Sequence, residues 1–217
     1  SSSATVYGDP ENVPINESHP TNPTNPYGFS KLMAEKLLQT LYRNDPQWKI
    51  VILRYFNPIG AHKSGLIGDD PLSEASSNLM PEMIKVVNGS KNYLQVFGDD
   101  YETLDGTGVR DYIHIMDLSE GHIDAIGFLK SKESIYEVIN LGSGKGYSVF
   151  QMIREFELST GCEIPFLIEG RRDGDVAKYL ADISKAKNLL GWSPKRSLKQ
   201  ICIDGWNWQR NNPQGYI

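Results

Sequence analysis

Tyr27 and Lys31 lie four residues apart in a stretch with helical spacing of its apolar residues. Their side chains are therefore expected on one face of a helix, one turn from each other. A phenol is a weak acid, and a neighbouring ammonium group favours the phenolate, the form that acts as a general base. The pair alone arises by chance in many proteins, where an exposed tyrosine and lysine lie on a solvated helix.

A serine upstream strengthens the interpretation. Residues 2–7 are typical of the carboxyl end of a buried strand that runs into a loop, and Ser3 precedes Tyr27 by 24 positions. Ligands of open α/β sheets bind beyond the carboxyl ends of the strands, where Ser3 and the loop after Phe56 are expected to meet. We therefore expect a Ser-Tyr-Lys triad. The simpler alternative is that the serines only cap the strand end.

The segments around the triad predict how it is positioned. Five prolines in residues 8–26 predict a long ordered loop, residues 27–42 an amphipathic helix that follows Pro26, and residues 50–56 a buried strand. Strand end, helix and strand in succession predict a parallel sheet. Residues 58–75, rich in Gly, Pro and Asp, are expected to form a loop that leaves this sheet.

The rest of the chain predicts a smaller α+β lobe. Helices are expected near 78–88, 117–130, 148–160, 182–190 and 197–210, and strands near 94–97, 136–141 and 164–168. We expect an α/β fold: residues 1–57 as the C-terminal part of a Rossmann-type sheet domain, and residues 58–217 mainly as a substrate lobe. Some segments of the second part are expected to return to the sheet.

Composition argues against several partners. The net charge is −5 with no basic run, which argues against nucleic acid and anionic membranes. No apolar stretch approaches the roughly 20 residues that span a bilayer. The four histidines show no metal-ligand spacing, and no metal is expected. Cys162 and Cys202 have no companion at metal spacing and indicate a reducing compartment, so a cytoplasmic enzyme domain is expected.

Several short motifs along the chain, taken together, indicate a particular enzyme family. They are SSSATVYG, NPYGFSK, LRYFNPIGAH, NLMP, FGDDY, DGTGVRDYIH, NLGSGKGYSV, RRDGD and GW. Together and in this order they resemble the UDP-glucose 4-epimerase family, which belongs to the extended short-chain dehydrogenases/reductases. The resemblance implies that UDP-galactose and UDP-glucose, the UDP-hexose substrates, are interconverted by transient NAD-dependent oxidation at sugar carbon 4.

The resemblance also implies residue roles. Tyr27 is the base for the sugar 4-hydroxyl, Lys31 supports it and holds the nicotinamide ribose, and Ser3 hydrogen-bonds the same hydroxyl. Phe56 contacts the cofactor and Asn57 the diphosphate-sugar. The positions matching those that hold UDP are Asn78, Leu79, Gln95, Val96, Phe97, Arg110, Arg172, Asp173, Gly174 and Asp175.

These roles agree with the chemistry of the side chains. Guanidinium groups suit a diphosphate, and Phe97 offers an apolar face to uracil. Taken singly, Arg110 and Arg172 are also compatible with surface ion pairs, and Phe97 with a core aromatic. Tyr179 matches a position that gates the sugar pocket, where its bulk favours plain hexoses over N-acetylated sugars.

The sequence departs from the family in one large respect. It contains no G-x-x-G-x-x-G loop to hold the cofactor pyrophosphate, and the glycines at 142–146 lie far downstream, where a loop of the substrate half is expected instead. We therefore expect this chain alone to hold no NAD and to be inactive, unless another chain supplies the loop. Phe29 and Leu104 are also less polar than is usual in the family. The family commonly forms homodimers through the 27–42 helix.

Two alternatives stay open. Another nucleotide-sugar enzyme of the superfamily, a 4,6-dehydratase or decarboxylase, would share most motifs. A dehydratase needs acidic residues beside the triad, and residues 3–6 supply none. The second alternative is a non-catalytic nucleotide-sugar-binding module, because half of the cofactor site is missing.

Overall fold

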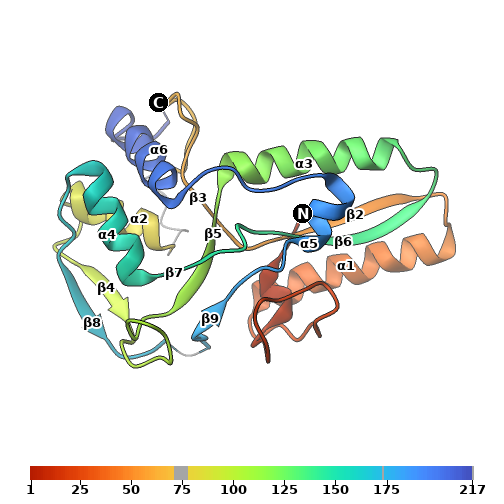
Figure 1. Cartoon of the computed structure of the whole chain (residues 1–217), viewed down its shortest axis with the longest axis horizontal. Coiled ribbons are helices and arrows are strands. Elements are labelled where there is room, and N and C mark those ends of the chain that lie inside the picture. The colour runs from red at the N-terminus through yellow and green to blue at the C-terminus, as the bar shows by residue number, and fades with distance from the viewer. Residues whose placement is uncertain (71–77, 173, 217) are drawn as a thin grey trace.

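The computed structural model describes residues 1–70, 78–172 and 174–216 as an α/β protein with parallel sheets (Figure 1). In chain order the elements are β1 (Ser2–Ser3), the 3-10 helix η1 (Ala4–Tyr7), α1 (Pro26–Asn44), β2 (Lys49–Tyr55), β3 (Asn57–Ile59), α2 (Leu79–Val87), β4 (Leu94–Phe97), β5 (Val109–His114), α3 (Ile115–Lys130), β6 (Ile135–Leu141), β7 (Gly146–Ser148), α4 (Val149–Thr160), β8 (Phe166–Glu169), β9 (Lys178–Tyr179), α5 (Ser184–Leu190) and α6 (Leu198–Asn211). The expected fold class is confirmed.

The first sheet has the order β1-β2-β6 and is parallel throughout. Ser2 lies opposite Arg54, and Arg54 lies opposite Asn140, so the three form one row across the sheet. Helices α1 and α3 flank the sheet on opposite sides (Figure 1). On the α3 side, buried Leu53, Ile139 and residues of α3 and α5 form one apolar core.

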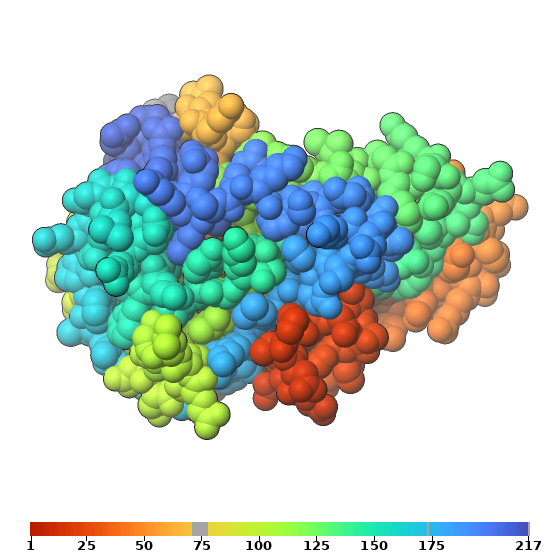
Figure 2. Space-filling view, viewed as in Figure 1, coloured from red at the N-terminus to blue at the C-terminus, as the bar shows by residue number. Residues whose placement is uncertain are grey.

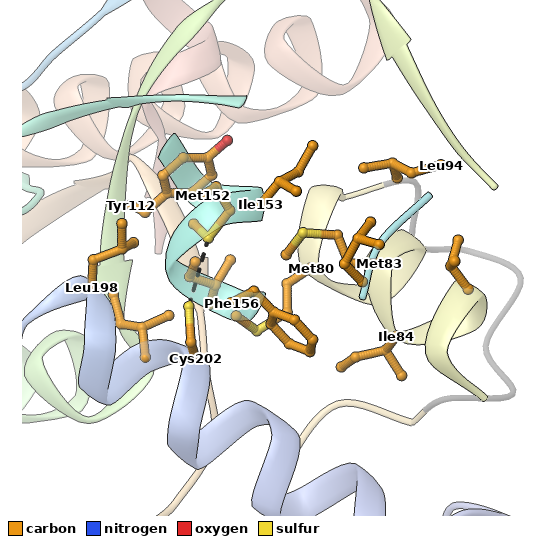
Figure 3. Packing of buried hydrophobic residues seen from close by; sticks show 14 of the residues in the cluster. Met80, Met83, Ile84, Leu94, Tyr112, Met152, Ile153, Phe156, Leu198 and Cys202 are labelled. Atoms are coloured by element: carbon orange, nitrogen blue, oxygen red, sulfur yellow. Dashed lines mark hydrogen bonds between the residues drawn. The ribbon is translucent and has the colours of Figure 1, made fainter. Parts of the chain in front are cut away.

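The second half of the chain builds two small sheets and another core. Strand β5 pairs with β3 and β9 in parallel and with β7 in antiparallel orientation, and β4 pairs with β8. Helices α2, α4 and α6 enclose a methionine-rich core in which Met83, Met152 and Phe156 are fully buried (Figure 3). Cys202 lies in the same core beside Met152, and both cysteines are free thiols.

The start of the chain packs against the segment that contains β9. The space-filling view shows the first residues beside the segment that contains β9 (Figure 2). Ile15 forms a β-bridge with Ala181, and the Tyr179 hydroxyl donates to the Ala4 carbonyl oxygen at 2.6 Å. A small core around η1 joins Val6, Tyr7, Phe56 and Ala181.

Helices were predicted better than short strands. The six α-helices of the described ranges lie within a few residues of where they were expected. The strand expected at residues 2–7 is only two residues long, because the Ser3 hydroxyl accepts from the Thr5 N–H and caps a 3-10 turn. Strands β3, β5, β7 and β9 were not expected. Most are two or three residues long, and β5 carries buried Asp111 within its run, which breaks the apolar pattern.

No helix in the described ranges is both long and apolar enough to cross a bilayer.

Candidate active site

The first turn of α1 presents Tyr27 and Lys31. The Asn25 side chain accepts from the Gly28 N–H at 2.8 Å, and Pro26 occupies the first helical position, which together fix where the helix begins. The Lys31 ammonium lies 5.5 Å from the centre of the Tyr27 ring, so the two residues share a helix face as expected. Tyr27 is 55% exposed and accessible to a substrate.

Gly28 allows this turn to approach the segment that follows Ser3. A Cβ atom at position 28 would lie 2.8 Å from the Thr5 carbonyl oxygen and 2.8 Å from the Pro23 Cβ. Any side chain here would push α1 away from η1. The Ser3 hydroxyl accepts from the Thr5 N–H at 3.2 Å and from the Thr5 hydroxyl at 3.0 Å. The structure thus brings β1, η1 and the start of α1 together.

Phe56 and Tyr179 form an aromatic pair beside this edge. Phe56 follows β2, is buried, and its ring centre lies 5.7 Å from that of Tyr179. Burial raises the pKa of Tyr179, so its hydroxyl stays neutral as it donates to Ala4. The pair therefore forms a fixed apolar wall between η1 and β9.

A cavity of about 270 Å³ lies next to Asn57, on the other side of the strand ends. Its lining includes the following residues of the expected UDP set: Asn57, Asn78, Leu79, Gln95, Val96, Phe97, Arg110, Arg172 and Asp175. Gly174 is described and exposed but does not line the cavity, and Asp173 lies outside the described residues. The triad, Phe56 and Tyr179 also lie outside this lining.

Two arginines supply the positive groups of the cavity, which is also lined by the carboxylates of Glu82 and Asp175. The Arg172 guanidinium lies 3.7 Å from the centre of the Phe97 ring, a cation–π contact at the cavity wall. Arg110 is held by the Val176 carbonyl at 2.7 Å and by the Asp175 carboxylate at 3.2 Å. A planar base and an anionic group suit such a cavity, since guanidinium forks pair well with phosphate.

Further residues line the cavity that were not assigned from the sequence, among them Glu82, Tyr101 and Tyr112. Burial raises the pKa of Tyr112 to about 12. The Tyr101 hydroxyl is buried and has no hydrogen-bond partner in the part of the chain that the structure describes. Tyr101 is the last residue of the FGDDY motif, so this motif could have identified it as a cavity residue.

The glycine-rich loop at 142–146 binds an internal carboxylate. The N–H groups of Ser143 and Gly144 donate to the Asp111 carboxylate at 2.5 and 2.9 Å, and the Ala181 N–H donates at 3.1 Å. Burial raises the pKa of Asp111, while these hydrogen bonds oppose the rise. Since its amides are already engaged, the loop is not a free phosphate cradle, in agreement with the sequence interpretation.

A larger and mainly apolar cavity of about 500 Å³ lies between α2, α6 and the start of α3. Of the predicted site residues, only Asn78 lines it. We regard the smaller cavity as the candidate site, because it combines two guanidinium groups with an aromatic face.

Comparison with known proteins places this geometry in a family. The family model described as GDP-mannose 4,6 dehydratase matches residues 1–204. The chain is 51% identical over 216 residues to the UDP-glucose 4-epimerase of Dictyostelium discoideum and 50% identical to that of Bacillus subtilis. All of this chain is covered in both matches, but it spans only 62% and 63% of the relatives' lengths.

Solved structures agree. The UDP-glucose 4-epimerase of Bifidobacterium longum, in complex with NAD+ and UDP, superposes with a TM-score of 0.92 at 49% identity, covering 100% of this chain and 64% of that one. The enzyme of Stenotrophomonas maltophila, with NAD and formylated UDP-arabinopyranose, gives 0.94 at 47% identity, covering 98% and 62%. The chain therefore belongs to the extended short-chain dehydrogenase/reductase family that the GDP-mannose 4,6 dehydratase model describes, and within it is homologous to the UDP-glucose 4-epimerases.

Proposed function

We propose that this chain carries the catalytic triad and the UDP-sugar cavity of an enzyme that interconverts UDP-galactose and UDP-glucose. The proposal rests on one observation, the position of the Tyr27–Lys31 pair relative to the cavity. The pair lies near the ends of β1 and β2, and Asn57, two residues after β2, lines the cavity that contains two arginines and Phe97. Neighbouring segments therefore supply a base for an alcohol, Tyr27, and a cavity able to bind a nucleoside diphosphate.

In the proposed reaction, the Tyr27 oxygen takes the proton of the sugar 4-hydroxyl while Ser3 hydrogen-bonds the same group. The Lys31 ammonium stabilises the negative charge that Tyr27 carries in this step. Phe97, Arg110 and Arg172 keep UDP bound in the cavity while the 4-keto hexose rotates and presents its opposite face. Tyr27 then returns the proton after reduction from the opposite face, which gives the epimer.

NAD, when bound, supplies the oxidation and re-reduction of sugar carbon 4. The residues of this chain fit its nicotinamide end, since Lys31 can donate to the ribose and buried Phe56 provides an apolar surface. The described residues offer no loop that could bind the cofactor pyrophosphate, because amides of the 142–146 loop already donate to the Asp111 carboxylate. We therefore assign the pyrophosphate loop to residues outside this sequence and expect the 217-residue chain alone to bind no NAD and to be inactive.

The order of the motifs along the chain also suggests that its two parts have different roles. We assign residues 1–57, together with β6, to the cofactor side, and the remainder of 58–217 mainly to the UDP-sugar side. Support comes from β6 pairing with β2 and from the cavity lining, most of which follows residue 57.

We further propose that the complete protein is a cytoplasmic homodimer that pairs through α1. Met33 and Leu37 on α1 are 71% and 63% exposed, which leaves an apolar stripe on this helix. Two free cysteines suit a reducing compartment.

The test uses what we term the joined protein: this chain preceded by the part of the Bacillus subtilis relative that lies outside the matched region. The joined protein should convert UDP-galactose to UDP-glucose, measured with a coupled UDP-glucose assay, whereas the chain alone should not. Formation of a 4-keto-6-deoxy sugar instead would identify a dehydratase. UDP binding without any turnover by the joined protein would favour a binding module.

A further inference from the structure

Glu35 continues the helix face that carries Tyr27 and Lys31, one four-residue step further along α1. Unlike those two residues it is buried, with 6% of its side chain exposed. Its carboxylate accepts from Arg54 Nε at 2.9 Å and from Arg54 Nη2 at 2.6 Å, a bidentate pair, and from the Ser2 hydroxyl at 2.5 Å. A single carboxylate thus ties α1 to both β1 and β2.

Arg54 is fixed on its other side as well. Its guanidinium lies 4.7 Å from the centre of the Tyr7 ring, and the Tyr7 hydroxyl donates to the Asn140 side chain at 2.7 Å. Asn140 lies opposite Arg54 on β6, and its side-chain amide donates to the Ile15 carbonyl at 2.9 Å. The arginine therefore has little freedom to follow Glu35 if the helix shifts.

The other attachments of helix α1 are weaker: Leu32 packs against the core around η1, and near the far end the Tyr42 hydroxyl lies 3.2 Å from that of Ser134. Of its 19 residues, only Gly28 and Glu35 are buried. Gly28 meets the Thr5 backbone through close contact, which constrains distance but offers no directional bond. The bidentate pair at Glu35 is directional, because a carboxylate matches a guanidinium fork in one plane. Lys31 lies between these two points, and Tyr27 directly precedes Gly28.

We propose that Glu35 and Arg54 act as a clamp that sets the axial position and rotation of α1, and so the placement of Tyr27 and Lys31 relative to Ser3. This inference deepens the proposed function and rests on it. Glu35 is a positioning residue, since its hydrogen bonds go to Arg54 and Ser2. The clamp explains why a mostly exposed helix carries a buried carboxylate.

The test compares Glu35→Gln with Asp117→Asn in the joined protein. Asp117 is a matched control: a buried carboxylate on α3 whose Oδ1 accepts from Arg196 Nη1 at 2.5 Å, far from α1. Glu35→Gln is expected to lower kcat for UDP-galactose at least tenfold and to change KM less than threefold, because the UDP cavity is built from other elements. Asp117→Asn is expected to leave kcat within twofold even where it lowers the unfolding midpoint.

A double variant separates position from stability. Glu35→Met with Arg54→Met replaces the buried pair by apolar side chains, which commonly restores stability. The clamp predicts that the unfolding midpoint recovers while kcat stays low. Recovery of both, or a Glu35→Gln enzyme with normal kcat, would overturn the proposal.

A third measurement does not depend on turnover. In the 217-residue chain, Glu35→Gln should speed amide hydrogen exchange over residues 27–35 at least tenfold relative to α3, and Asp117→Asn should not. If the joined protein shows no epimerisation, the proposed reaction fails but the exchange comparison still decides the clamp. Equal exchange of residues 27–35 in Glu35→Gln and wild type would overturn it.

Discussion

The edge that carries Ser3, Tyr27 and Lys31 (the triad edge) and the cavity proposed to hold UDP are built in opposite ways. At the triad edge most polar groups bond to one another. Ser2, Glu35 and Arg54 form one network and Tyr7 donates to Asn140, although Arg54 Nη1 has no hydrogen-bond partner among the described residues. In the cavity, the Tyr101 hydroxyl has no hydrogen-bond partner, and Arg172 stacks on Phe97 and forms no ion pair, as far as the described residues go. Hydrogen bonds among neighbouring side chains fix the position of a base, whereas unpaired polar groups suit the capture of a ligand.

The two regions also differ in what supports them. Tyr27 and Lys31 stand on a helix that is mostly exposed. Residues of the cavity stand on β4, β5 and α2, which rest on the core of Met83, Met152 and Phe156 (Figure 3). Substitutions near α1 should therefore lower kcat more than they lower UDP affinity. Substitutions at the cavity should lower UDP affinity more than they lower kcat.

The largest effect on binding is expected from Arg172→Met in the joined protein. Loss of a charge-assisted contact to a phosphate should weaken UDP about 10- to 100-fold, which titration calorimetry will measure. The neighbouring Arg171 is the control. It pairs with exposed Asp100 and lies over the outer side of Tyr101, 4.2 Å from the ring centre, but does not itself line the cavity. Arg171→Met should therefore change UDP affinity less than threefold. Equal losses in both variants would contradict the assignment of the cavity.

Gly28→Ala should give the next largest effect, and it should act on α1. The new Cβ would meet the Thr5 oxygen at 2.8 Å, and such overpacking costs about 1–3 kcal/mol. Turnover should fall with it, while UDP affinity stays within twofold. Gly127 on α3 is a matched helical glycine with nothing within 4 Å of an added Cβ. Gly127→Ala should instead stabilise the fold by up to about 1 kcal/mol in urea unfolding. A harmless Gly28→Ala would show that the approach of α1 to η1 is not needed.

The smallest expected effect is on stability, and it distinguishes a tyrosine with a hydrogen-bond partner, Tyr7, from one without, Tyr101. Tyr7→Phe removes a buried hydrogen bond to Asn140 and should cost about 1–2 kcal/mol of unfolding free energy. Tyr101→Phe removes a hydroxyl that has no partner among the described residues, so without ligand its stability should change by less than about 0.5 kcal/mol. Matching losses in the two variants would mean that the cavity is as internally bonded as the triad edge.

Sequence patterns predicted the helices because the longer ones carry an apolar stripe at helical spacing over ten or more residues, as in α4 and α6. Strand β5 was missed since Arg110 and Asp111 interrupt its apolar run, although Asp111 is fully buried. Most of the cavity residues followed from the family motifs. The roles of Glu35, Arg54 and Asp111 did not, because burial of a charged side chain depends on partners that are distant in sequence, as Glu35 and Arg54 are.

The most direct test of the account is Tyr27→Phe in the joined protein, with turnover and UDP affinity measured on the same preparation. The account predicts that conversion of UDP-galactose falls by about a thousandfold or more, since a general base contributes roughly 10²–10⁴ and no other group replaces it. UDP affinity should stay within twofold, because Tyr27 lies outside the cavity lining. Conversion within tenfold of wild type would contradict the account.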